Sequence, residues 1–125
     1  MKKISKSIPF NFVIENLLSA HPIIKPMFGA HALYIDNKII LMLRDKKDED
    51  RGIWIATTFE HHKSLKKNFP TMRSIKVFGS TESSWQMLPA DSDDFETSVN
   101  LLCDFILKRD TRIGRIPKPK KKKKI

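Results

Sequence analysis

The sequence predicts an α+β fold, in which a mostly antiparallel sheet of about five strands carries helices packed on one face. Three segments show apolar residues at the spacing of an amphipathic helix, and two pairs of short strand-like runs are each joined by a polar turn or loop. A chain of 125 residues, 40% of them hydrophobic, has room for one core. The expected order is helix, hairpin, strand, helix, hairpin, helix.

The first helix is expected to begin at Phe10 and to end at Pro22. Its apolar stripe follows the i, i+3, i+4, i+7, i+8 pattern and consists of Phe10, Val13, Ile14, Leu17 and Leu18. Phe12 lies off this stripe, so we expect the N-terminal residues to half cover it; the alternative is that it belongs to a contact surface.

Residues 30–35 and 38–44 form the first predicted hairpin, because Asp36-Asn37 tolerates the positive φ of a type I′ turn. A two-residue loop places Ile35 opposite Lys38, Leu33 opposite Ile40 and His31 opposite Met42. The better core face, where two alanines let a helix pack closely, is then the one with Ala30, Ala32, Tyr34, Ile39, Leu41 and Leu43. His31 should be half exposed on the other face.

A charged loop separates this hairpin from a single strand at 53–57. Thr57 and Glu60 have the spacing of a capping box, so the middle helix is expected to begin there and to end at Pro70. Its inward stripe is predicted to hold Phe59, His62, Leu65 and Phe69.

Residues 73–78 and 85–89 are predicted to form a second hairpin around the polar loop 79–84. The last helix starts near residues 91–94, where acids and a capping serine suit the helix dipole, and runs to about Arg109. Its buried face is expected to contain Phe95, Val99, Leu102 and Ile106, flanked by Leu101, Cys103 and Phe105.

The net charge of +10 is concentrated at one end of the chain. Residues 111–125 hold eight of the 24 Lys and Arg and none of the 14 Asp and Glu, so residues 1–110 carry 16 cations against 14 acids. We therefore expect a folded domain at 1–110 and a disordered basic tail at 111–125. The tail is a candidate phosphate-binding arm or only a solubilising segment, and its cations are Arg112, Arg115, Lys118, Lys120, Lys121, Lys122, Lys123 and Lys124.

A second candidate for nucleic-acid binding is a basic patch on the outer side of the middle helix and just beyond it. It consists of Lys63, Lys66, Lys67, Arg73 and Lys76. Because charged outer faces are also the default for surface helices, the sequence leaves open whether this patch is functional.

The sequence predicts no catalytic site, no metal site and no cofactor. Zinc sites need paired ligands, and neither C-x-x-C nor H-x-x-x-H occurs. Cys103 lies at the edge of an apolar stripe, as inert cysteines do. No glycine-rich phosphate loop occurs in the sequence. An enzyme that uses His31, His61 or His62 is kept as the third hypothesis.

A cytoplasmic location is expected. The single Cys cannot form an intramolecular disulfide, and no apolar run approaches the roughly 20 residues of a membrane span. The basic start of the chain is not followed by the apolar region of a signal peptide.

The segment Pro26-Met27-Phe28-Gly29-Ala30, followed by Leu33-Tyr34-Ile35-Asp36-Asn37-Lys38, resembles the opening signature of the TfoX N-terminal domain family, named for a bacterial competence regulator. In that family a Met-Phe-Gly-Gly run leads into a hairpin with a Tyr and an Asp-Gly turn. A looser resemblance covers about residues 10–109. It implies an α+β domain with a regulatory, non-enzymatic role, and no site residues.

Two glycines of the family signature are replaced here, by Ala30 and Asn37, and the regulator's second domain has no counterpart in these 125 residues. Met27 and Phe28 are expected in the core, with Gly29 at a close approach or a positive φ.

Three hypotheses about function follow. The first is a non-enzymatic regulatory or interaction module of the TfoX N-terminal type, associated with nucleic acid through its lysine tail. The second, suggested by Phe12 and by the partly polar hairpin face, is a module that binds a protein partner or a second copy of itself. The third is the histidine-dependent enzyme.

Overall fold

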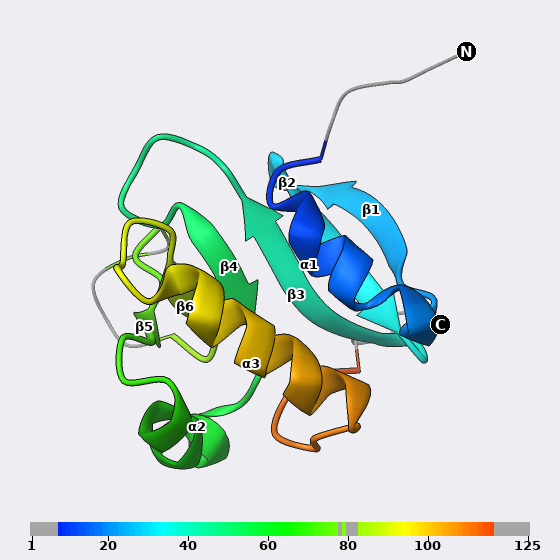
Figure 1. Ribbon diagram of the computed structural model, residues 1–125. Helices are drawn as coiled ribbons and strands as arrows, with labels where there is room; N and C mark the ends of the chain where they lie inside the picture. Colours follow the sequence, from blue (N-terminus) through cyan, green and yellow to red (C-terminus); the bar gives the residue numbers. More distant parts are fainter. Residues whose placement is uncertain (1–7, 78, 80–82, 117–125) are drawn as a thin grey trace, which may run out of the picture.

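The computed structural model describes residues 8–77, 79 and 83–116, and it has the predicted α+β class (Figure 1). Its sheet has six strands in the order β1-β2-β3-β4-β6-β5, and every neighbouring pair is antiparallel. The strands are β1 (Ile23–Met27), β2 (Ala30–Ile35), β3 (Lys38–Arg44), β4 (Gly52–Ile55), β5 (Arg73–Ser74) and β6 (Gln86–Pro89). The helices are α1 (Asn11–Asn16), α2 (His62–Asn68) and α3 (Phe95–Leu107), with short 3₁₀ helices η1 (Leu18–Ala20) and η2 (Phe59–His61).

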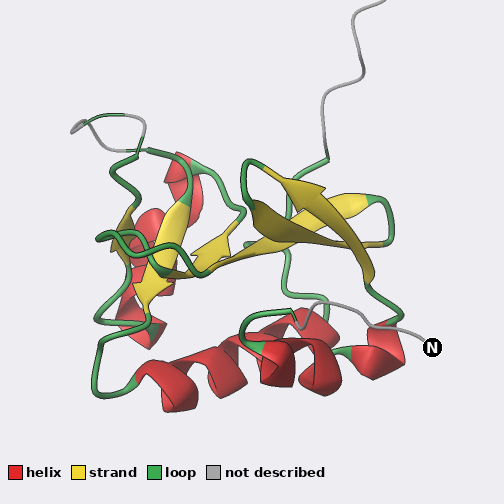
Figure 2. Cartoon of the chain, turned by 90° about the horizontal axis from the view of Figure 1, so that it is seen from above, coloured by secondary structure: helices red, strands yellow, loops and turns green. Residues whose placement is uncertain are grey.

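Helices α1 and α3 lie along one face of the sheet, whereas α2 lies beyond the ends of β5 and β6 (Figures 1 and 2). Aromatic rings join the two covering helices: the ring of Phe95 lies 5.5 Å from that of Phe10 and 6.3 Å from that of Phe12. Phe12 is half-buried against α3, and residues 1–7, which we expected to cover it, lie outside the described residues.

The main core lies between this face of the sheet and the two helices. Its side chains come from α1 and its C-cap (Val13 and Leu17), from α3 (Val99 and Leu102) and from the middle of the sheet, where Leu33, Leu41 and Leu43 are fully buried. Each such side chain stabilises the fold by about 1.5–3 kcal/mol through burial. A second cluster, on the helix-free face, contains Ala32, Met42, Trp54 and Met87.

The first hairpin has the predicted turn and the predicted pair of Ile35 with Lys38, but its register differs further from the turn. Asp36 and Asn37 have φ values of 53° and 68°, as a type I′ turn requires. The pairing then shifts between Tyr34 and Leu33, so that Leu33 lies opposite Leu41 and His31 opposite Leu43. The extra residue is Ile40, which makes this a β-bulge.

Because a bulge interrupts the alternation of side chains, the residues of the predicted core face are divided between the two faces of the sheet: Leu41 and Leu43 lie in the main core as predicted, whereas the prediction is wrong for Ala30, Ala32 and Ile39. The helices pack on the face of Leu33 and Ile35, and the alanine face with Ala30 and Ala32 belongs to the second cluster. His31 is half-buried, as predicted.

Strand β1 is missing from the sequence prediction, because Lys25 and Pro26 interrupt its apolar pattern. An edge strand tolerates both residues, since its outer side needs no hydrogen-bond partner within the sheet. Phe28 and Gly29, at φ values of 52° and 76°, form the turn into β2. The expectation that Phe28 is a core residue is wrong, since its side chain is 73% exposed; Met27 is half-buried against the second cluster.

The capping box predicted for the middle helix does not form. The hydroxyl group of Thr57 donates a hydrogen bond to the carbonyl oxygen of Arg112 at 2.7 Å, and the chain enters α2 through η2 without a side-chain cap. This tighter first turn places Phe59 on the surface, whereas Leu65, Phe69 and His62 are buried as predicted.

The second hairpin is shorter than predicted, because β5 contains only two residues. Helix α3 begins at Phe95, and the carboxylate of Asp94 just before it accepts hydrogen bonds from the hydroxyl groups of Ser92 at 2.5 Å and Ser98 at 3.1 Å. These bonds, that from Ser92 foremost, hold the pKa of Asp94 below its usual value.

The chain remains folded beyond residue 110, so the prediction of disorder from 111 is wrong for 111–116. Ile113 is 4% exposed, and Arg115 exchanges two backbone hydrogen bonds of 2.9 Å with Ile39. Gly114 allows this approach: with φ at 108°, a Cβ atom there would lie 2.8 Å from Cδ1 of Ile40. Residues 117–125 lie outside the described residues.

None of the helices formed by the described residues is both long enough and apolar enough to cross a lipid bilayer.

Candidate nucleic-acid interface

An open groove of about 510 Å³ lies between α2 and the β5–β6 end of the sheet, within the usual size range of ligand sites. The residues that line it are Phe59, His62, Lys63, Lys66, Met72, Arg73, Ser74 and Gln86. Three of these are cations from the predicted basic patch, and no carboxylate belongs to this set. A groove lined in this way favours an anionic ligand.

Two exposed lysines of α2 form one wall of the groove. Lys63 and Lys66 lie three residues apart, so they are neighbours on the helix surface. The ammonium group of Lys66 donates a hydrogen bond of 2.6 Å to the carbonyl oxygen of Met72, which holds it at the groove. An ammonium group has three donors, so Lys66 can also bind a phosphate oxygen.

The rings of Phe59 and His62 form a tilted pair at this wall. Their ring centroids are 5.0 Å apart, and the side chain of Phe59 is 57% exposed. Nε2 of His62 lies 3.1 Å from the carbonyl oxygen of Ser84, a hydrogen bond that requires the proton on Nε2. His62 is thus held in place and supports the Phe59 ring.

The other cations of the basic patch differ in their surroundings. Arg73 reaches the groove, but its guanidinium group forms an ion pair of 3.2 Å with buried Asp50 and donates to the backbone of Glu49. Lys76 pairs with the carboxylate of Glu49 at 3.3 Å and is outside the lining set, as is the exposed Lys67 of α2. The groove therefore depends on Lys63 and Lys66 for charge that no ion pair balances among the described residues.

Arg112, a candidate from the predicted tail, is part of the fold. Its guanidinium group forms an ion pair of 2.6 Å with Asp110 and donates hydrogen bonds to Ser64 and Asn68 of α2. The hydrogen bonds from Arg112 lower the pKa of Asp110 below its usual value. Since these groups already occupy Arg112, its assignment to a phosphate contact stays a prediction with no support from this geometry.

Arg115, near the end of the described chain, is linked to the groove through Ser84. Its guanidinium group donates a 3.0 Å hydrogen bond to the hydroxyl oxygen of Ser84, the residue whose carbonyl oxygen contacts His62. Ser84 therefore connects the groove with the segment that leads into residues 117–125. The remaining tail candidates, Lys118 and Lys120 to Lys124, lie outside the described residues, and their role stays a prediction.

The histidines do not assemble into a catalytic group in this groove, which His62 lines but His31 and His61 do not. Within 8–77, 79 and 83–116, no group of three or more His, Cys, Asp or Glu side chains is placed to hold a metal ion. Cys103 is 2% exposed, and burial raises the pKa of its thiol to about 11, which disfavours the nucleophilic thiolate.

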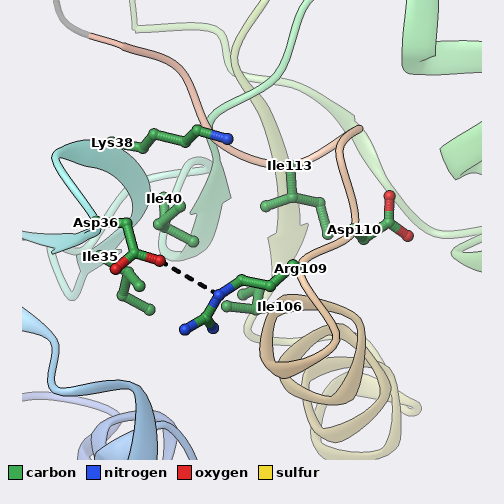
Figure 3. A pocket seen from close by; sticks show the side chains of 8 residues that line it. All are labelled: Ile35, Asp36, Lys38, Ile40, Ile106, Arg109, Asp110 and Ile113. Atoms are coloured by element: carbon green, nitrogen blue, oxygen red, sulfur yellow. Dashed lines mark ion pairs between the residues drawn. The ribbon is translucent and has the colours of Figure 1, made fainter.

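A smaller cavity of about 50 Å³ lies between the β2–β3 turn and the end of α3 (Figure 3). Its floor consists of the buried side chains of Ile35, Ile40, Ile106 and Ile113. Asp36 and Arg109 form an exposed ion pair of 3.2 Å beside it. Its size and apolar floor indicate a gap in packing rather than a site for chemistry.

Arg109, just after the end of α3, has a left-handed backbone conformation, and we expect this conformation to reduce the stability of the fold. Asp110 N–H donates to Phe105 and Arg109 N–H to Ile106, the two bonds of a Schellman motif, and Arg109 has the positive φ of 59° at which glycine is preferred. We expect Arg109→Gly to be more stable than Arg109→Ala by about 1 kcal/mol, because both variants lose the ion pair and only Ala keeps the strain. Urea denaturation of the two variants measures the difference, and equal midpoints would contradict the prediction.

Phe59 lines the groove, although it was predicted to belong to the inward stripe of the middle helix. Phe59 precedes Lys63 and Lys66 by four and seven residues, the spacing at which an aromatic and two cations fall on one side of a helix over two turns. That spacing was the signal for a mixed aromatic and basic surface.

No family model, no curated protein and no solved structure matches this chain, so the resemblance to TfoX N-terminal domains stays a prediction.

Proposed function

We propose that this protein is a non-enzymatic interaction module that binds nucleic acid, and that the groove beside α2 and the lysine-rich C-terminal segment act as one surface. The observation that carries this proposal is the position of Ser84, which binds both His62 in the groove and Arg115 just before residues 117–125. Those nine residues include six lysines and no acid. A regulatory role of the TfoX N-terminal type is part of the proposal and would use this binding.

The charge distribution favours a chain of phosphates over a single anion. The body from 1 to 110 is nearly neutral, whereas the end of the chain carries most of the net charge of +10. A phosphate backbone presents regularly spaced charges, and each lysine that neutralises one releases a counterion. The two lysines of the groove and the six lysines of residues 117–125 are together enough to neutralise several successive phosphates.

The proposal is tested by comparing the full chain with a chain that ends at Ile116, which retains the contacts of Ile113 and Arg115. Fluorescence anisotropy with oligonucleotides at several salt concentrations gives the affinities. We expect the shorter chain to bind at least about tenfold more weakly than the full chain. The negative slope of the logarithm of the association constant against the logarithm of the salt concentration should become shallower by up to about four, or about 0.7 for each of the six lysines removed. Equal affinities and slopes would overturn the role of the segment.

The contribution of the groove is tested in the same way with Lys63→Glu/Lys66→Glu. Lys47→Glu/Lys108→Glu is the matched control, because it reverses the same number of charges at two exposed lysines, one in the β3–β4 loop and one at the end of α3, that do not line the groove. We expect the groove variant to lose at least about tenfold more affinity than the control. Similar losses would show that only the overall charge matters.

Self-association is the second candidate function. Strand β1 is an open edge of the sheet, and Leu18 and Ile23 near its start are each 59% exposed. Lys25 and Pro26 in the same strand oppose pairing with another strand, which is why we place this function second. Light scattering tests it, since a monomeric mass at all concentrations would exclude it.

A further inference from the structure

We infer that the ligand of the groove is single-stranded nucleic acid and that Phe59 is the platform on which an unpaired base stacks. This inference rests on the proposed function and specifies which form of nucleic acid the groove recognises.

The Phe59 ring is exposed but held in place. Its side chain is 57% exposed, and its ring lies 5.0 Å from that of His62, at an interplanar angle of 44°. His62 is itself 9% exposed and bonded to the backbone of Ser84. A ring backed by a fixed neighbour loses little freedom when a base stacks on it, which is the requirement for a stacking platform.

The cations have the positions that a strand stacked on Phe59 would need. Lys63 and Lys66 follow Phe59 along the same wall, and the hydrogen bond from Lys66 to Met72 holds its ammonium group at the groove. Gln86 on the opposite side is also fixed, since its amide nitrogen donates to Ser74 and to Ser83. Proteins that bind single strands combine such a basic groove with aromatic platforms.

A duplex would not use Phe59 in this way. The faces of paired bases are covered by their neighbours in the stack, and exposing one costs a few kcal/mol. Contacts to phosphates alone would serve a duplex and a single strand alike. The exposed aromatic ring beside the lysines is therefore the feature that distinguishes the two ligands.

The experiment uses the full chain and three probes of equal length, about 12 nucleotides: oligothymidine, an abasic strand with the same phosphates, and a duplex. We expect Phe59→Ala to weaken oligothymidine binding about tenfold and to leave binding of the abasic strand unchanged. Phe59→Tyr should retain the affinity, because tyrosine keeps the ring. An oligouridine arm should behave like oligothymidine, since both present unpaired bases.

Phe28→Ala is the matched control, since it removes another exposed aromatic ring, at the β1–β2 turn, and should change the affinity for oligothymidine less than twofold. If Phe59→Ala changes the affinities for oligothymidine and the abasic strand equally, or changes neither, the base-stacking role is wrong while nucleic-acid binding stands. If the unmodified chain binds none of the probes, the proposed function itself is wrong.

Discussion

Replacing Asp50 with alanine is expected to lower the free energy of unfolding by about 3–5 kcal/mol. Asp50 is 1% exposed and its carboxylate connects two loops: Oδ2 accepts the backbone N–H groups of Lys76 at 2.8 Å and Val77 at 2.7 Å, and Oδ1 accepts from Arg73 at 3.2 Å. Alanine would leave these donors without their acceptor. These hydrogen bonds are part-buried, and a charged acceptor makes each of them worth about 1.5–3 kcal/mol.

Chemical denaturation monitored by the fluorescence of the two tryptophans measures this effect. Glu49→Ala is the matched control, because Glu49 is the neighbouring acid and its exposed side chain pairs only with the exposed Lys76 among the described residues. We expect the control to change the free energy of unfolding by no more than about 0.5 kcal/mol. Equal effects of the two substitutions would contradict the structural role of Asp50.

Ending the chain after Asp110 is expected to lower the free energy of unfolding by at least about 3 kcal/mol. The burial of Ile113 alone contributes about 1.5–3 kcal/mol. The truncation also removes the backbone pair between Arg115 and Ile39, the 2.7 Å hydrogen bond from Gly114 to Ala56, and the acceptor of the Thr57 hydroxyl group. Each lost hydrogen bond adds about 1 kcal/mol or more where a buried group is left unpaired.

The control for this truncation is the chain that ends at Ile116, whose free energy of unfolding should match that of the full chain within about 0.5 kcal/mol. Thermal or urea unfolding of the three chains tests the prediction, which is wrong if both truncations are equally stable. The result also decides the design of binding experiments. Loss of binding after truncation at 110 would report unfolding as well as charge, whereas truncation at 116 reports charge alone.

Much of the candidate site could be read from the sequence, because Lys63 and Lys66 lie at helical spacing and Arg73 follows shortly after the helix. Lys63, Lys66 and Arg73 were all in the predicted basic patch, and the groove contains the three together. The sequence could not show that Asp50 balances Arg73, since 23 residues separate them and the pairing depends on how two loops pack. The exposure of Phe59 could not be predicted either, because its position fits the buried stripe of a regular α-helix. In the structure Phe59 lies in a 3₁₀ turn, which directs its side chain outward.

Local patterns in the sequence alone were sufficient for the α+β class, for the course of α3, for the turn at Asp36-Asn37 and for the burial of His62. These features depend on neighbours within a few residues, so periodicity and turn chemistry predict them. The bulge at Ile40, the edge strand β1, the ordering of 111–116 and the groove required the tertiary structure. The last two depend on contacts between distant segments, such as Thr57 with Arg112 and Ile39 with Arg115, whose energies outweigh the local preferences of the chain. The bulge and β1 belong to strands that are neighbours along the chain, but the packing of the sheet decides the bulge, and the edge position of β1 is what tolerates Lys25 and Pro26.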